Sequence, residues 1–154
     1  MHTPDDIDLK ILEILQKEGR TRRTELADRV KLSLPAASER LRKLEETGLV
    51  LGYHAVLDPK KFGKDITAFV VVTVDSSRHF NAFVENARTT EEIMECHAIT
   101  GEGTHLLKIR TDNTASLEKL LGRVQSWQAV VKTTTSLVLS TGKETSNIKI
   151  RSSH

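Results

Sequence analysis

The sequence predicts an α+β protein in which three helices precede a βαββαβ unit. Apolar residues recur at helical spacing as far as residue 48, and after residue 65 β-branched strand patterns alternate with helical ones. Asp58-Pro59 and Gly63 interrupt the chain between these two parts. We therefore expect one domain over residues 1–58 and a second over residues 59–154.

Three helical patterns make up the first part. The first, from residue 5 to 19, repeats isoleucine at helical intervals, and the second opens on Thr21, a residue type that caps helix starts. After a two-residue gap, Ser33 is the expected N-cap of a third helix that runs to residue 48. Helices of this length with a tight turn before the last are typical of a helix-turn-helix. Residues 49–57 then predict an extended strand, as a wing or linker.

The second part predicts a ferredoxin-like domain. The order βαββαβ produces a four-stranded antiparallel sheet with helices on one face. The first strand has apolar residues on both faces, so we expect a second copy of the chain to cover the outer face. The tail after Gly142 is expected to be poorly ordered. The predicted strands are residues 66–75, 92–100, 104–110 and 130–140, and the predicted helices are residues 78–88 and 114–125.

Basic residues gather in the first part, although the whole chain carries a formal net charge of only +2. Residues 17–43 contain nine lysines and arginines against four acids, so this stretch carries +5 and the rest carries −3. A local basic patch on a nearly neutral protein is typical of polyanion binding. On charge counts alone, a solvated helical surface is the favoured interpretation.

The third helix has the shape that a DNA groove requires. A helix reads base edges in the major groove only where its backbone comes close, and small side chains at its leading end allow that approach. On a helical wheel, the face away from the core is small at its start, polar in its middle and basic farther on. The preceding helix usually crosses the DNA backbone, where its first arginines would hold a phosphate. The predicted DNA contacts are Arg22, Arg23, Ser33, Pro35, Ala36, Ser38, Glu39, Arg40, Arg42 and Lys43.

Several of these assignments have a structural alternative. Ser33 is first an N-cap, and base contact is the minority interpretation. Arg40 has the alternative of an ion pair with acids of its own domain, such as Glu39 or the acids around Glu46. Because Glu39 repels phosphates, in a groove it must accept a hydrogen bond from a base or pair with a neighbouring cation.

The order of motifs along the chain resembles the Lrp/AsnC family of transcription regulators, also called feast/famine regulators. The matching motifs are DDIDLKIL, GRTRRTELADRVKLS, SERLRKLEETGLVLGY, HAVLDPKKFG, TGEGTHLLKI and KTTTSLVL, and they span nearly the whole chain. The resemblance implies an N-terminal winged helix-turn-helix and a C-terminal domain that binds an effector and oligomerises. It also implies dimers that assemble further, often to octamers, and small molecules, commonly amino acids, bound between C-terminal domains.

Two positions depart from the family pattern. The turn between the DNA-binding helices usually carries a glycine where this chain has Lys31, so that turn requires a slightly strained backbone. The effector loop commonly reads Gly-Asp-Tyr-Asp, and Thr104 now stands where a carboxylate would suit an α-ammonium group, which leaves a different effector, or none, open. A hairpin turn and ordinary strand propensity explain this region equally well. The predicted effector region comprises Gly101, Glu102, Gly103, Thr104, Thr134 and Ser136.

Other classes of function lack sequence support. The six histidines and Cys96 form no metal-ligand spacing, and no phosphate-binding glycine loop or nucleophile elbow is present, so we expect neither an enzyme nor a cofactor. A single cysteine excludes an intrachain disulfide. No apolar run approaches the ~20 residues of a membrane span. The acidic N-terminus does not resemble a signal peptide, so we expect a cytoplasmic protein without a membrane partner.

The sequence therefore predicts a sequence-specific transcription regulator. Its expected partners are double-stranded DNA, further copies of itself and a small-molecule effector, with an amino acid as the first candidate. Two alternatives stay open: a sequence-neutral DNA-organising protein without an effector, and a ligand-sensing module that does not bind DNA. The second alternative would not explain the basic residues of the second and third helices.

Overall fold

The structure, a computed structural model, describes residues 3–150 and divides into two compact units. The N-terminal unit consists of the chain up to Val56 together with the segment from Lys143 onward, and the C-terminal unit consists of residues 57–142. The boundary after Val56 falls close to the predicted one. The second domain was expected to run to residue 154, whereas residues 143–150 group with the first unit; residues 151–154 lie outside the described residues.

The tail has a specific contact on the N-terminal unit, in contrast to the poorly ordered segment expected from sequence. The side-chain amide of Gln16 donates a hydrogen bond to the carbonyl oxygen of Ile148 at 3.1 Å and accepts one from the N–H of the same residue at 2.7 Å. The side-chain amide thus bonds to both the N–H and the C=O of one residue, as the backbone of a neighbouring strand does. The tail therefore has a defined partner at Gln16.

Three helices form the N-terminal unit: α1 (Asp6–Lys17), α2 (Arg23–Val30) and α3 (Leu34–Glu46). Asp5 caps α1, with its carboxylate accepting hydrogen bonds from the N–H groups of Ile7 at 3.0 Å and Asp8 at 2.9 Å. The helices pack around one apolar cluster, which buries Ile11, Ile14, Leu26, Val30, Leu41 and Leu44. The predicted helix-turn-helix is confirmed.

Three local expectations in this unit are wrong. Thr21 does not cap α2, because its hydroxyl donates to the carbonyl oxygen of Glu18 at 2.6 Å and Arg22 occupies the N-cap position. Leu34, which the helical spacing of α3 places on one face with Ala37, Leu41 and Leu44, is not buried with them and is 45 % exposed at the first turn. Residues 49–57 contain no strand. A strand needs a paired neighbour, and within the described chain residues 51–57 form no backbone hydrogen bond with another segment.

The turn between α2 and α3 depends on Lys31 in the left-handed conformation, with φ 58° and ψ 44°. We expected a strained backbone at this position, because the family pattern has a glycine where this chain has Lys31. Because a left-handed L-residue costs roughly 1–2 kcal/mol, we expect Lys31→Gly to raise the free energy of unfolding by about 1 kcal/mol. Urea denaturation measures the change. Lys31→Ala removes the same charge but keeps the Cβ atom, so it should produce no gain; equal stabilisation by both variants would contradict the backbone explanation.

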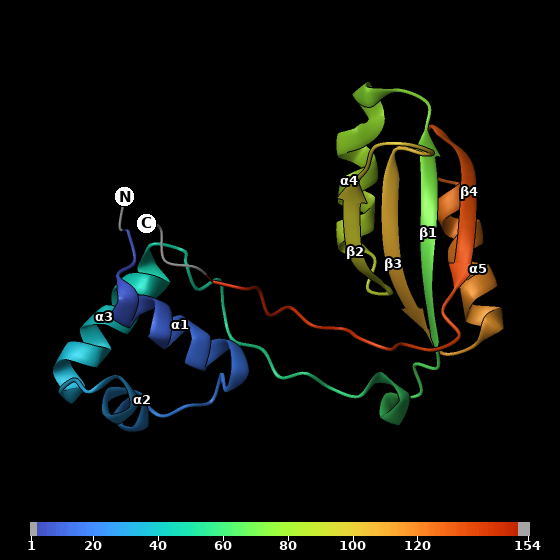
Figure 1. Ribbon diagram of the computed structural model, residues 1–154. Helices are drawn as coiled ribbons and strands as arrows, with labels where there is room; N and C mark the ends of the chain where they lie inside the picture. Colours follow the sequence, from blue (N-terminus) through green and yellow to red (C-terminus); the bar gives the residue numbers. More distant parts are fainter. Residues whose placement is uncertain (1–2, 151–154) are drawn as a thin grey trace. The chain divides into compact units, whose positions relative to one another are not determined.

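The C-terminal unit is one antiparallel sheet with strand order β2-β3-β1-β4 and two helices on one face (Figure 1). The strands are β1 (Ile66–Val74), β2 (Ile93–Ala98), β3 (His105–Thr111) and β4 (Val130–Leu137); the helices are α4 (Phe80–Thr89) and α5 (Thr114–Gln125), with short 3-10 helices η1 (Pro59–Phe62) and η2 (Ser77–His79). This arrangement confirms the ferredoxin-like prediction. Over residues 3–150, none of the helices is both long enough and apolar enough to cross a membrane.

The core of this unit lies between the sheet and the helices. Alternate residues of β1 and β3 point into it, where they meet Phe83 and Ala87 of α4 and Leu120 and Val124 of α5. His105 is buried in the same layer, with its ring 4.7 Å from the rings of Phe80 and Phe83. Burial among these rings lowers the pKa of His105, so the imidazole is neutral near pH 7.

Candidate functional site

The face of α3 that points away from the core presents the side chains that the sequence predicts there. Ser33 caps the helix, with its hydroxyl accepting a hydrogen bond from the N–H of Ala36 at 3.4 Å, so its N-cap role is confirmed. Pro35 and Ala36 are exposed and Ser38 is half-buried. Side chains of this size beside the free N–H groups of a helix start allow close approach of a polyanion.

Farther along α3, the exposed face carries an ion-pair stripe, which we define as Glu39, Arg42, Lys43 and Glu46. The Glu39 carboxylate accepts hydrogen bonds from Nε of Arg42 at 2.9 Å and from Nη2 at 2.7 Å, and lies 3.9 Å from Nζ of Lys43. Glu46 accepts from Nη1 of the same arginine. The Arg42 guanidinium lowers the pKa of Glu39, which is therefore ionised near neutral pH.

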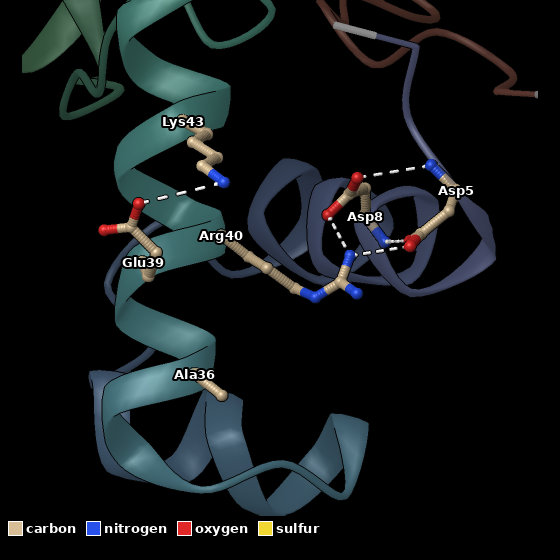
Figure 2. A pocket seen from close by; sticks show the side chains of 6 residues that line it. All are labelled: Asp5, Asp8, Ala36, Glu39, Arg40 and Lys43. Atoms are coloured by element: carbon tan, nitrogen blue, oxygen red, sulfur yellow. Dashed lines mark hydrogen bonds and ion pairs between the residues drawn. The ribbon is translucent and has the colours of Figure 1, made fainter.

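Arg40 points to α1 instead of into the exposed face. Its Nη1 atom lies 2.8 Å from Oδ2 of Asp5 and 2.9 Å from Oδ1 of Asp8, as Figure 2 shows. Asp8 is only 1 % exposed, so this ion pair joins α3 to a buried carboxylate. The charge of Arg40 is therefore used within the unit, by Asp5 at the N-cap of α1 and by Asp8, and not by Glu39 or the acids around Glu46, so we leave Arg40 out of the proposed DNA contacts.

A pocket of about 420 Å³ lies beside this ion pair (Figure 2). Three acids and two cations line it together with one small side chain, so its charges largely cancel. The lining residues are Asp5, Asp8, Ala36, Glu39, Arg40 and Lys43. The pocket lies at the junction of α1 and α3, and Ala36 is the one lining residue without an ionisable side chain.

The basic patch is weaker in the structure than the count over residues 17–43 indicates. Residues 3–56 contain ten lysines and arginines and ten acids, so they carry no net charge. Arg40, for example, pairs with Asp5 at 2.8 Å and with Asp8 at 2.9 Å, and both acids precede the counted window. Acids from outside the counted window neutralise cations inside it, which a running charge count along the chain misses.

Arg22 and Arg23 differ from these paired cations. Both are exposed at the first turn of α2, and within residues 3–150 neither forms an ion pair. Their side chains keep their hydrogen-bond donors available for a phosphate group. Of the predicted DNA-binding residues, these two have the environment that a phosphate contact needs.

The predicted effector region is partly brought together on the outer face of the sheet. In the β1–β4 ladder, Val71 stands opposite Thr134 and Phe69 opposite Ser136, so both polar residues flank an apolar strip of β1. Gly103 approaches the same strip, since a Cβ atom there would lie 2.4 Å from Cγ1 of Val71. Glu102 and Gly101 are exposed beside it.

The side chain of Thr104, however, forms its hydrogen bonds within the C-terminal unit. Its hydroxyl donates to the carbonyl oxygen of Val72 at 3.1 Å, accepts from the N–H of Val74 at 3.0 Å and lies 2.9 Å from Nδ1 of His105. These contacts fasten the turn before β3 to β1. The expected role of the Thr104 side chain in effector binding is therefore corrected to a structural one, because its hydrogen-bonding capacity is used internally.

Gly103 is required both by its backbone conformation and by lack of space. Its φ is +82°, and an added Cβ would meet Val71 at 2.4 Å and the carbonyl oxygen of Val72 at 3.2 Å. We expect Gly103→Ala to lower the free energy of unfolding by about 2 kcal/mol. Gly101→Ala is the matched control, since Gly101 has φ +93° with nothing within 4 Å, and should cost about 1 kcal/mol from strain alone. Thermal denaturation of both variants measures the difference; equal losses would contradict the close-contact argument.

Sequence reasoning missed two residues of the N-terminal site, Asp5 and Asp8. Their spacing indicates only the cap of α1, and the partner in α3 lies more than 30 residues away in the chain. No cluster of three or more His, Cys, Asp or Glu side chains suited to a metal ion occurs in the part of the chain that the structure describes.

Two family models match this chain, one in its N-terminal part and one in its C-terminal part. Residues 4–50 match a family model for a winged helix-turn-helix DNA-binding domain, and residues 67–148 match one for the Lrp/AsnC ligand-binding domain. The proline dehydrogenase transcriptional activator of Rhizobium radiobacter is 38% identical over 150 residues, which cover 94% of this chain and 96% of the relative. The leucine-responsive regulatory protein of Salmonella typhimurium is 37% identical over 153 residues, covering 96% and 92%.

Solved structures agree with these relatives. A transcriptional regulator from Neisseria meningitidis, in complex with L-Met, superimposes with a TM-score of 0.90 at 32% identity, covering 96% of this chain and 97% of that one. Both matched domains, their order and nearly full coverage lead to one conclusion. The chain belongs to the Lrp/AsnC family and is a DNA-binding transcriptional regulator with a C-terminal ligand-binding domain.

Proposed function

We propose that the chain binds the major groove of double-stranded DNA through the exposed face of α3, with Arg22 and Arg23 on a neighbouring phosphate. Two observations together support this assignment. Helix α3 begins with the small residues Pro35 and Ala36, and two exposed arginines at the start of α2 have no ion-pair partner within residues 3–150. Small side chains admit the helix and the arginines supply the attraction. The role is binding, not catalysis, and suits a cytoplasmic protein.

Salt dependence tests the electrostatic part of this proposal. We expect the logarithm of DNA affinity to fall linearly with the logarithm of salt concentration, with a slope of roughly −0.9 for each phosphate neutralised. Fluorescence anisotropy with a labelled pool of random duplexes measures the slope. A flat response, or no binding at low salt, would support the alternative of a ligand-sensing module that does not bind DNA.

We further propose that a second copy of the chain covers the outer face of the sheet and that a small molecule binds beside it, near Glu102, Gly103, Thr134 and Ser136. Phe69 at the centre of that face is 36 % exposed, which is a large apolar side chain to leave in water. A dimer or larger assembly of the full chain in sedimentation equilibrium supports the covered face. A monomer at micromolar concentration contradicts it.

An amino acid is the proposed effector, since Glu102 offers a carboxylate to an α-ammonium group and a relative was solved with L-Met. The test is a thermal-shift panel of the twenty amino acids on the full chain and on Glu102→Gln. We expect at least one amino acid to raise the melting temperature of the full chain, and the gain to be lost in Glu102→Gln. A panel in which none stabilises the protein excludes an amino-acid effector.

A further inference from the structure

The ion-pair stripe on α3 is an unusual surface for a helix that enters a groove lined by phosphates. Two of its four residues, Glu39 and Glu46, are carboxylates, and each side chain is at least half exposed. Together with the absence of net charge over residues 3–56, this means that the helix face itself adds little attraction for the DNA backbone. A carboxylate in that position repels phosphates and weakens binding unless it accepts hydrogen bonds from the bases.

Glu39 is the carboxylate placed to do so. It follows Ala36 by three residues, so the two side chains are neighbours on the surface of α3, and the small one lets this part of the helix approach closely. Arg42 holds it by two hydrogen bonds, one to each oxygen. A carboxylate has about four lone-pair sites, so each oxygen keeps one for a further donor. Arg42 thus orients Glu39 without using all of its acceptor capacity.

The major groove presents two kinds of amino donor, N4 of cytosine and N6 of adenine. Adenine also presents the N7 acceptor beside its amino group, and this atom repels the second oxygen of a carboxylate. Cytosine has no acceptor at that position of its edge. A fixed carboxylate on the groove-facing side of α3 therefore discriminates in favour of cytosine.

We propose that Glu39 is a specificity-determining residue that accepts a hydrogen bond from N4 of a cytosine in the major groove, with Arg42 as its positioning residue. The inference rests on the proposed function and deepens it, because it names the base that the helix selects. It makes the chain a sequence-reading regulator instead of a sequence-neutral DNA organiser.

The test is selection of bound duplexes from a randomised pool by the full-length wild type, Glu39→Ala, Glu39→Gln and Glu46→Ala. We expect the wild type to select cytosine at one position of each half-site by roughly 5- to 150-fold over other bases. Glu39→Ala should lose this preference. Glu39→Gln should accept adenine there as well, since an amide can both donate and accept. Glu46→Ala is the matched control, because it removes an equal charge and the other partner of Arg42, and should keep the cytosine.

The outcomes separate this inference from the proposed function. A Glu39→Ala variant that binds and still selects the wild-type base would overturn the inference, as would a wild type that binds every sequence equally, while the groove-binding proposal stands. A wild type that retains no duplex at low salt overturns both. Circular dichroism of each variant distinguishes a lost base preference from lost folding. Because the Glu39 side chain is exposed, we expect its variants to fold as the wild type does.

Discussion

Replacing Arg22 and Arg23 together with alanine should weaken DNA binding about 60-fold at about 0.1 M salt, because two phosphate contacts with a salt exponent of ~0.9 each are lost. The two side chains are exposed and, across residues 3–150, form no ion pair, so the fold should be unaffected. Fluorescence anisotropy over a series of salt concentrations measures both quantities. The slope should become less steep by about 1.8.

A double variant in the other unit provides the control for this experiment. Arg88 pairs with Glu85 at 2.8 Å and Arg123 with Glu92 at 2.9 Å, so Arg88→Ala with Arg123→Ala removes the same total charge from exposed helical positions. We expect that variant to bind DNA as the wild type does. If the two double variants lose affinity equally, net charge and not the start of α2 determines binding.

Arg40→Ala should lower the free energy of unfolding of the N-terminal unit by about 3 kcal/mol, the second large effect. The variant removes the cation that lies 2.9 Å from Asp8, and a carboxylate that is 1 % exposed cannot exchange that partner for bulk water. Arg40 is itself 31 % exposed, which places the expected loss at the lower end for buried pairs. Urea denaturation followed by circular dichroism measures it.

Arg42→Ala is the matched comparison on the same helix. Its partners Glu39 and Glu46 are half exposed or more, and water replaces a lost cation beside such carboxylates at little cost. We expect stability close to that of the wild type. If Arg42→Ala proves as destabilising as Arg40→Ala, the distinction between an internal arginine and a groove-facing one fails, and Arg40 returns to the set of candidate DNA contacts.

Expectations based on local periodicity agree closely with the structure. The helix expected over residues 114–125 is α5 with the same bounds, and Ser33 caps α3. Each of these depends on residues a few positions apart, whose spacing is visible in the chain itself. Thr21 and residues 49–57 show the limit: a capping residue type and a β-branched pattern each need a free backbone partner nearby.

For this protein, the sequence alone determined the order of helices and strands, the exposed face of α3 and the family. The tertiary structure alone decided which candidate side chains are available for binding. Arg40 pairs with Asp8 of α1, the Thr104 hydroxyl bonds to β1, and Ile148 bonds to Gln16. These partners are separated by about 30 to more than 130 residues in the chain. Helical and strand periods reflect neighbours in the chain, whereas hydrogen bonds and ion pairs depend on which elements fold against one another.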